Sequence, residues 1–298
     1  MKKILLIKHG SLGDIISSTS IINDIRKHYL KDKIILLTSE KYINFFDNSN
    51  LINEAFIDNR KGFFSTIMII KKIINLKPDL IIDLQNSQRT SIYVFIIRFF
   101  SRIKINSTSI FANYRYIYSK KLLPSVIDGL SNQVEILGIK TRRKPFLNWL
   151  NSNSFNFNEI GNKNYFIINP GCSKKNSHKR WPAINYAKIC SYLISRGILP
   201  VVIGSNEDKE VLELIADKEK RIINLLNKSP INVIFALSQK AKGAISNDTG
   251  PAHLIAASGC NIHLLLSNFS NTKTVIPQGK NVSYTQSTNI ENILVDDI

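Results

Sequence analysis

An acidic residue, Asp14, lies at the expected turn between a strand and a helix near the N-terminus. The stretch KHGSLGDIISST, residues 8–19, follows the apolar run Ile4–Ile7, and its glycines lack the spacing of a dinucleotide-binding fingerprint. Asp14 can act in two ways. It can cap the helix, which is worth about 1 kcal/mol, or it can be a general base at a ligand site. In the second case Ser11 and Gly13 would let the backbone bend close to a ligand.

A second candidate site is the loop NPGCSKKNSHKRWP, residues 169–182, between an expected strand and an expected helix. Ser173 and Lys179 in this loop offer a hydroxyl and an ammonium group, which are donors that suit a diphosphate. Trp181 and Pro182 define its end, because proline suits a first helical position. The loop is therefore either an ordered anion site or a solvated basic segment.

A third candidate site is SNDTGPAHL, residues 246–254, where another expected strand leads into a helix. Free N–H groups at the start of a helix bind anions, and Gly250 permits close approach of a ligand. Asp248, Thr249 and His253 flank that position. The alternative is structural, with Asp248 as a helix cap and His253 packed in the first turn.

A fourth, weaker candidate is GSNEDKE, residues 204–210, at a further strand end. Glu207 or Asp208 could accept hydrogen bonds from a ribose, as acids do at nucleotide sites. A simple cluster of acids at a helix start explains the same residues equally well.

These loops require a scaffold of alternating strands and helices, and the sequence predicts one. Short runs rich in β-branched residues predict strands at Ile4–Ile7, Ile34–Thr38, Leu80–Asp83, Phe166–Asn169, Leu199–Ile203, Gly243–Ser246 and Ile262–Leu266. Helical patterns cover Ile15–Tyr29, Thr66–Asn75, Ala183–Ser195, Asp208–Ala216 and Ala252–Ser258. Continuous apolar strands that alternate with helices indicate parallel βαβ units, so the fold class is α/β.

A polar stretch, NSNSFNFNEIGNKN at residues 151–164, has the composition of a linker and divides the chain nearly in half. Each half has its own series of strands and helices. Two Rossmann-like domains with parallel sheets, facing across a cleft, are the simplest interpretation. A single large sheet with a surface loop is the alternative.

The formal net charge of +18 predicts attraction to nucleic acid, acidic lipid head groups or phosphorylated sugars. The chain is also rich in Lys, Asn and Ile, as an AT-rich genome would encode, so part of the charge can be compositional. Its basic residues are scattered, with short clusters at residues 140–144 and 174–180.

The three cysteines, Cys172, Cys190 and Cys260, are far apart, which suggests neither a disulfide framework nor a zinc site. The first apolar run ends at Lys8, too early for a signal peptide, and the apolar stretches FFSTIMII and SIYVFIIRFF are too short to span a membrane. We therefore expect a cytoplasmic protein without a transmembrane segment.

Together the motifs resemble glycosyltransferase family 9, the ADP-heptose:lipopolysaccharide heptosyltransferases. The opening ILLIKHGSLGDIISSTSII, DLQNSQRTS at Asp83–Ser91, NQVEILGI at Asn132–Ile139, the KRWP loop and SNDTGPAHLIAASG are similar to the family's ordered set of motifs. His9, Gly10 and Asn86 depart from the family pattern, which usually has a small polar pair and a glycine at these places.

The resemblance implies a GT-B fold with three parts. Residues 1–155 would bind the acceptor, residues 164–286 would bind the nucleotide sugar, and residues 287–298 would form a C-terminal helix that returns to the first domain. The reaction would be inverting and independent of metal, with no cofactor. The substrates would be an ADP-sugar, with ADP-heptose as the expected donor, and a lipid-linked saccharide at the inner membrane surface, which allows peripheral attachment of the enzyme.

On the matching positions, Asp14 would be the catalytic base. The donor would be bound by Ser173, Lys179, Asp208, Asp248, Thr249, Gly250 and His253. The acceptor would be bound by Ser11, Gly13, Gln85 and Arg89. A family member that uses another nucleotide sugar or acceptor is the main alternative. A non-catalytic basic module that binds nucleic acid or an acidic membrane surface is a remote one.

Overall fold

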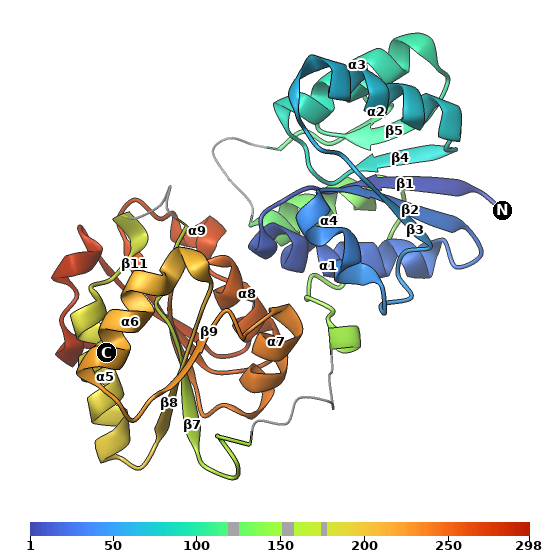
Figure 1. The fold of residues 1–298 in the computed structure, drawn as a ribbon. Helices are drawn as coiled ribbons and strands as arrows, with labels where there is room; N and C mark the ends of the chain where they lie inside the picture. The colour runs from blue at the N-terminus through green and yellow to red at the C-terminus, as the bar shows by residue number, and fades with distance from the viewer. Residues whose placement is uncertain (119–124, 151–157, 174–177) are drawn as a thin grey trace. The chain divides into compact units, whose positions relative to one another are not determined.

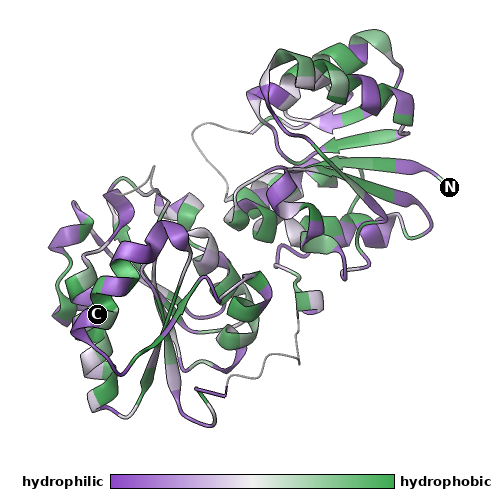
Figure 2. Ribbon diagram, in the orientation of Figure 1, coloured by the Kyte–Doolittle hydropathy of each residue, from purple (hydrophilic) through white to green (hydrophobic). Residues whose placement is uncertain are grey.

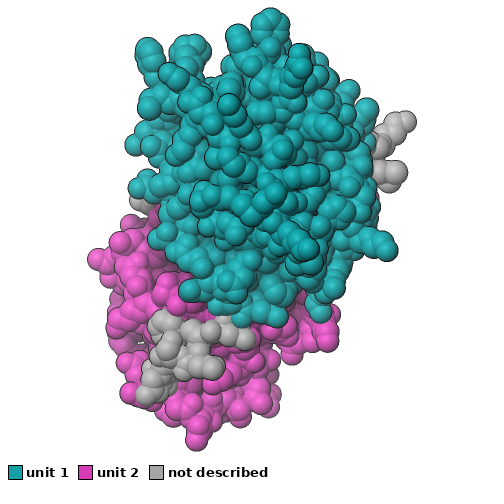
Figure 3. Space-filling model, turned by 90° about the vertical axis from the view of Figure 1, so that its right-hand side faces the viewer, with its two compact units in different colours: residues 1–149 teal, residues 150–298 magenta. Residues whose placement is uncertain are grey.

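The computed structural model describes residues 1–118, 125–150, 158–173 and 178–298 of the chain. The chain forms two compact units, Met1–Trp149 and Leu150–Ile298 (Figure 3). The division lies just before the polar stretch 151–164, of which residues 151–157 lie outside the described residues. Each unit is built on one six-stranded parallel sheet, as the alternation of apolar runs and helices predicts.

The sheet of the first unit has the strand order β3-β2-β1-β4-β5-β6, and all its neighbouring strands are parallel. Its strands are β1 (Lys3–Ile7), β2 (Lys33–Thr38), β3 (Glu54–Ile57), β4 (Leu80–Asp83), β5 (Lys104–Ser107) and β6 (Tyr114–Arg115). Chain order therefore reverses between β1 and β4, which makes this point the topological switch of the sheet.

Helices cover both faces of the first sheet (Figure 1). The helices α1 (Leu12–His28) and α4 (Val126–Glu135) pack together on one face, and α2 (Gly62–Leu76) and α3 (Gln88–Phe100) pack together on the other. Two 3-10 helices, η1 (Glu40–Phe46) and η2 (Asn148–Leu150), complete the set of helices. The inner strands are strongly hydrophobic (Figure 2) because both of their faces are covered. One core cluster joins Leu5 and Ile81 of the sheet to Ile73 of α2 and Tyr93 of α3.

The second unit repeats this topology with the strand order β12-β11-β10-β7-β8-β9. Its strands are β7 (Tyr165–Asn169), β8 (Leu199–Gly204), β9 (Ile223–Leu226), β10 (Ala244–Asn247), β11 (Ile262–Ser267) and β12 (Val282–Ser287). Its helices are α5 (Ala183–Ser195), η4 (Asn206–Asp208), α6 (Lys209–Lys218), α7 (Ile231–Lys240), α8 (Gly250–Ala257) and α9 (Thr272–Val275). The switch point here lies between β7 and β10.

The last residues differ from the expectation of a C-terminal helix over 287–298. Two short 3-10 helices, η5 (Ile290–Asn292) and η6 (Val295–Asp297), follow the last strand. Ile290 and Ile293 belong to the core cluster of the second unit, and the indole N–H of Trp181 donates to the carbonyl of Ile293 at 2.9 Å. The expected helix is therefore wrong in form, and apolar side chains of this segment pack in the second unit. The expected return to the first domain stays a prediction.

Apart from the expected C-terminal helix, all of the predicted strands and helices occur, with ends shifted by up to a few residues. The structure adds the strands β3, β5, β6, β9 and β12 and the helices α3, α4, α7 and α9. Within the described residues, no helix is both long enough and apolar enough to cross a membrane.

Candidate active site

The motif loops lie at the switch points of the two sheets. In an open parallel sheet, ligands bind outside the carboxyl ends of the strands at the point where chain order reverses. In the first unit, β1 ends at Ile7 and β4 ends at Asp83. In the second unit, β7 ends at Asn169 and β10 ends at Asn247. The topology therefore brings the predicted site residues together within each unit.

In the first unit, Asp14 is part of the start of α1. Ser11 is the N-cap, and its N–H and hydroxyl both donate to Asp14 Oδ2 at 3.1 Å. In return, the N–H of Asp14 donates to Ser11 Oγ at 3.4 Å. This is a capping box, so the structural role considered for Asp14 is present. The carboxylate remains partly exposed, and its Oδ1 has no hydrogen-bond partner among the described residues.

The backbone bends at Gly10 rather than at Gly13. Gly10 has φ +34°, and a Cβ there would lie 2.8 Å from the Cβ of Asp14, so only glycine lets this turn approach the helix start so closely. Gly13 is a buried residue in the first turn of α1. The expectation that Gly13 supplies the bend is therefore wrong.

Gln85 connects the two loops at this switch point. Its side-chain oxygen accepts hydrogen bonds from the N–H groups of His9 and Gly10, at 2.9 and 3.0 Å. Its own N–H donates to Asp83 Oδ1 at 3.0 Å. Gln85 therefore fixes the shape of the turn before Asp14, a structural role that does not depend on contact with an acceptor.

Lys8 is a site residue that the sequence reasoning missed. It follows β1 directly, it is buried, and its ammonium group donates to the carbonyl of Leu84 at 3.1 Å. Burial lowers the pKa of Lys8, and the carboxylates of Asp14 and Asp83 offset part of that shift. A cation therefore lies close enough to Asp14 to interact electrostatically with its carboxylate. The signal in the sequence was a lysine that directly follows an apolar strand.

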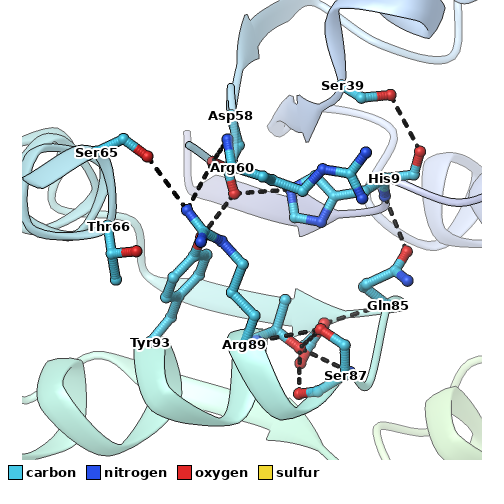
Figure 4. A network of polar contacts seen from close by, with 12 residues as sticks. His9, Ser39, Asp58, Arg60, Ser65, Thr66, Gln85, Ser87, Arg89 and Tyr93 are labelled. Carbon is cyan, nitrogen blue, oxygen red and sulfur yellow. Dashed lines mark hydrogen bonds and ion pairs between the residues drawn. The ribbon is translucent and has the colours of Figure 1, made fainter. Parts of the chain in front are cut away.

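A buried acid, Asp58, organises the polar side chains beside this turn (Figure 4). Its Oδ2 accepts a hydrogen bond from the Tyr93 hydroxyl at 2.7 Å and lies 3.2 Å from Nε2 of the buried His9. The backbone N–H of Arg60 donates to Oδ1 at 2.9 Å. Burial alone would raise the pKa of Asp58, but the bonds with His9 and Tyr93 hold that pKa well below its usual range.

Arg89 is held in this network from the side of α3. Its Nη2 lies 3.4 Å from Asp58 Oδ1 and 3.3 Å from Ser65 Oγ, while its Nε donates to the Tyr93 hydroxyl. The side chain is about a quarter exposed, at 26%. Arg89 is therefore fixed by its contacts with Asp58, Ser65 and Tyr93 (Figure 4), and its side chain remains partly exposed.

Asn86 adopts a left-handed backbone conformation, with φ +50°. Asparagine tolerates this conformation better than most residues other than glycine. Its side chain also joins three segments, since Oδ1 accepts from the N–H of Thr108 at 3.0 Å and Nδ2 donates to Gln133 at 2.6 Å. These contacts give a physical reason why asparagine can replace the glycine of the family pattern.

In the second unit, the start of α8 lies against the end of β7. Asn169 Nδ2 donates to Thr249 Oγ1 at 3.0 Å and to Ser246 Oγ at 2.7 Å. Thr249 is the N-cap of α8, and Gly250 is its first residue. His253 lies one turn further on and is half-buried. The positive end of the helix dipole at this helix start provides a position for an anion.

Lys179 and Asp248 form an ion pair beside that helix start. The Lys179 ammonium lies 2.6 Å from Asp248 Oδ2, which also accepts from the hydroxyl of the buried Ser270 at 3.3 Å. Ser173 is exposed and lies directly before residues 174–177, which are outside the described residues. The structure therefore brings Lys179, Asp248, Thr249 and Gly250 together at one switch point.

Asp208 faces into the protein. Its Oδ1 accepts from the N–H of Cys172 and from Arg180 Nη2, both at 3.0 Å. Its Oδ2 accepts from the N–H and the hydroxyl of Ser205, at 3.1 and 2.9 Å. Both carboxylate oxygens therefore support the 169–182 loop and the start of η4. The neighbouring Glu207 is exposed.

Two Rossmann-like units, each with its candidate ligand loops at the switch point, define a two-domain α/β enzyme of the GT-B class. The chain belongs to glycosyltransferase family 9 (heptosyltransferase), whose model matches residues 67–289. The protein is accordingly a glycosyltransferase. The predicted family is confirmed by this match, and the GT-B fold is confirmed by solved structures of heptosyltransferases.

Curated relatives cover most of the chain at low identity. The lipopolysaccharide core heptosyltransferase OpsX of Haemophilus influenzae is 21% identical over 276 residues, which are 87% of this chain and 77% of the relative. The lipooligosaccharide heptosyltransferase 2 of Campylobacter jejuni is 24% identical over 258 residues, which are 82% of this chain and 74% of the relative.

Solved structures show the same fold. The structure of E. coli ADP-heptose LPS heptosyltransferase II has a TM-score of 0.77 at 17% identity. The match covers 99% of this chain and 96% of the E. coli chain. The structure of E. coli heptosyltransferase WaaC with ADP-2-deoxy-2-fluoro heptose has a TM-score of 0.76 at 15% identity. The match covers 99% of this chain and 97% of the WaaC chain.

Proposed function

We propose that the enzyme transfers heptose from ADP-heptose to a lipopolysaccharide core acceptor, with inversion at the anomeric carbon and without a metal ion. The acceptor hydroxyl oxygen would form a bond to C1 of heptose while the bond from C1 to the ADP oxygen breaks. The hydroxyl proton would move to a base, and ADP would leave with the negative charge. No cofactor is needed for this balance of atoms and charges.

The observation that carries the proposal is the arrangement at the β7/β10 switch point. There the start of α8 and the ammonium group of Lys179 converge on a position suited to a diphosphate. Anion binding at this position would stabilise the charge that develops on ADP as it leaves. This supplies the role that a divalent cation fills in other phosphate chemistry. Ser173 and His253 lie on the same loops and are proposed to contact the donor.

The ribose of the donor is proposed to bind Glu207. Both oxygens of Asp208 already accept hydrogen bonds from the protein, whereas Glu207 lies exposed one residue earlier. A carboxylate at this strand end could accept hydrogen bonds from ribose hydroxyls. Asp208 would then serve the donor indirectly, because it holds Arg180 and Cys172 in the phosphate-binding loop.

The first unit is proposed to bind the acceptor, with Asp14 as the general base. The capping box holds Oδ2, so Oδ1 is the oxygen proposed to take the proton. Ser11 and Arg89 are the partly or fully exposed polar groups proposed to contact the acceptor. Gln85 and the turn at Gly10 would position this surface. An acceptor anchored in lipid would place the reaction at the cytoplasmic face of the inner membrane.

A transfer assay tests the reaction directly. The full chain is incubated with ADP-heptose and heptose-free lipopolysaccharide core in the presence of EDTA, and ADP release is compared with the mass gain of the acceptor. We expect one ADP for each heptose added and the opposite anomeric configuration by NMR. Transfer from UDP-sugars alone, or activity that EDTA abolishes, would overturn the assignment. A thermal-shift panel of nucleotide diphosphates identifies the preferred base, because binding raises the melting temperature by mass action.

A further inference from the structure

One face of the first unit is basic and carries no acid. Between Asp58 and Asp79 the sequence has no Asp or Glu but has Arg60, Lys61, Lys71, Lys72 and Lys77. Between Asp83 and residue 118 it again has no acid, and has Arg89, Arg98, Arg102, Lys104 and Arg115. The first stretch contains α2 and the second contains α3, which pack together on one face of the sheet (Figure 1).

The solvent side of α3 is hydrophobic. Its buried residues, Thr90, Tyr93, Val94 and Ile97, form the stripe that packs on the sheet. Ile92, Phe95 and Phe99 follow the spacing i, i+3, i+7 on the opposite side and are exposed, Phe99 by 77%. A helix that is hydrophobic all round belongs in a buried position or against a membrane rather than against water.

The solvent side of α2 continues this surface. Phe64 is 80% exposed, and Ile67 and Met68 lie beside it, one turn further along the helix. Lys71 follows them on the same exposed side. The starts of α2 and α3 are adjacent, because Arg89 of α3 contacts Ser65 of α2 at 3.3 Å. Both helices therefore present large apolar side chains and basic groups away from the same sheet.

The loop after β5 extends the surface past α3. Phe111 packs against Phe95 with the ring centroids 4.7 Å apart and the ring planes tilted by 56°, and the neighbouring Ile110 is 66% exposed. Such a cluster of large exposed apolar side chains marks an interaction site in a water-soluble unit. Basic residues accompany it on both helices.

We propose that this α2–α3 face docks the enzyme on a bilayer that contains anionic lipid. Phe64, Met68 and Phe99 would enter the boundary between head groups and acyl chains, while Lys71 and Arg98 bind lipid phosphates. Apolar side chains with interspersed basic residues are the combination that binds interfacial helices to anionic membranes. The inference concerns binding alone, so it holds or fails without reference to the proposed reaction.

The same features argue against two other occupants. Two copies of an acid-free basic face would repel each other, which opposes self-association through this surface. Nucleic acid would use the basic residues but leaves the exposed aliphatic and phenylalanine side chains without a partner, because phosphates are bound by charge. A lipid surface satisfies both the charge and the apolar side chains.

Vesicle sedimentation tests the proposal with the full chain. Binding is measured to phosphatidylcholine vesicles and to vesicles that also contain phosphatidylglycerol, at 0.1 M and 1 M salt. The α2–α3 face predicts strong binding only to the anionic vesicles, and weaker binding at high salt, where the Debye length falls from about 10 Å to about 3 Å. Absence of binding to the anionic vesicles at low salt overturns the proposal.

Paired variants locate the surface. Phe64→Ser with Phe99→Ser removes two apolar contacts, and should weaken vesicle binding by about tenfold or more. Lys71→Glu with Arg98→Glu should weaken it by about tenfold or more, since each basic group contributes near an anionic surface. The controls are Leu30→Ser with Leu294→Ser, and Lys228→Glu with Lys240→Glu, exposed residues outside the face. They should retain binding within about twofold.

A conservative variant separates a lost contact from a damaged fold. Phe64→Leu with Phe99→Leu keeps apolar side chains and should bind vesicles nearly as well as the original chain. Equal losses in the test and control pairs would overturn the assignment to this face. The assignment would also be overturned if the test variants lost oligomer mass or RNA binding while their vesicle binding stayed unchanged. Those results would assign the face to a second copy or to nucleic acid.

Discussion

Lys179 and Asp248 hold each other by an ion pair of 2.6 Å at the start of α8. Their side chains are 21% and 11% exposed, so neither charge is fully solvated. Asp248 therefore keeps the ammonium group of Lys179 in place beside the helix start, where the donor diphosphate is proposed to bind. Without that partner, the lysine would be free to extend into solvent, and its position would be lost.

Lys179→Ala should weaken ADP binding by about 10- to 100-fold, because a charged hydrogen bond is worth about 1.5–3 kcal/mol. The loss also leaves the carboxylate of Asp248 without its cationic partner, close to the proposed phosphate position. Calorimetric titration with ADP measures the change. Lys220→Ala removes an exposed lysine that pairs with Asp217 and should leave the affinity unaltered. An ADP affinity equal to that of the original chain would make Lys179 a structural residue only.

Asp14→Asn should lower the rate of transfer by roughly 10²–10⁴ while ADP affinity stays the same, since the amide cannot accept the proton. Stability should fall by no more than about 1 kcal/mol, because the amide oxygen of Asn can still accept from the N–H of Ser11 and only the charge at the helix start is lost. Turnover and melting temperature are the measurements.

Asp128→Asn is a matched control for the capping role of Asp14. At the start of α4, Asp128 Oδ2 accepts a hydrogen bond from the hydroxyl of Ser125 at 2.6 Å. The N–H of Asp128 donates to Ser125 Oγ at 3.2 Å. It shares with Asp14 the two contacts to the hydroxyl of a serine N-cap, and it has no proposed catalytic role. Equal, small losses of activity in both variants would remove Asp14 from the mechanism.

Asp208→Asn and Glu207→Gln should affect different properties of the protein, stability in the first case and ADP affinity in the second. Asp208→Asn should destabilise the second unit by roughly 1–3 kcal/mol, because its buried carboxylate accepts four hydrogen bonds, among them one from Arg180. Glu207→Gln should leave stability unchanged and weaken ADP binding. Urea denaturation measures the stability of each variant, and calorimetric titration measures its affinity for ADP. Weaker ADP binding in a fully stable Asp208→Asn protein would instead assign the ribose contact to Asp208.

Asp58 should make the first unit sensitive to acid. Its pKa is held below the usual range, so the unfolded chain takes up a proton at a higher pH than the folded chain does. The stability from ionised Asp58 is complete well above its unfolded pKa of about 3.9, and is lost as the pH falls through that value toward the lower folded pKa. Urea denaturation at several pH values should show this loss.

Asp58→Asn should be less stable at pH 7 by roughly 1–3 kcal/mol, and its stability should change less between pH 5 and pH 3. Asp128→Asn changes a carboxylate that is 41% exposed and should keep the original pH dependence. If Asp58→Asn shows the same acid profile as the original chain, another buried acid is responsible.

The sequence identified the strands that are covered on both faces, because such strands are continuous apolar runs. β4 and the helix α5 were predicted with the bounds that the structure has. Two of the missed strands, β3 and β12, lack this signal. β3 (EAFI) is half-exposed, and β12 (VSYTQS) is largely polar at an edge of its sheet. Helix α3 was missed because its outer side is as hydrophobic as its inner side, which removes the helical periodicity.

The candidate sites could be predicted in part, where the signal lies in neighbouring residues of the chain. Turn residues, basic groups and capping residues after strands made Asp14, Lys179 and the start of α8 candidates, and the structure places each of them at a switch point. The roles of Gln85 and Asp208 could not be predicted, because their partners lie 76 and 36 residues away in the chain. The end of the chain was predicted as a helix, but Ile290 and Ile293 pack in the core and limit it to short 3-10 turns.

The chain has only two tryptophans, and each unit contains one of them. Trp149 donates to the carbonyl of Phe45 at 3.0 Å and packs beside Phe46 in the first unit. Trp181 is fully buried in the second unit, where it holds Ile293 next to the loop of Lys179. Replacing either one by Phe leaves a single natural fluorophore. The emission of each variant would then follow the melting of one unit at a time, and show whether ligand protects that unit alone.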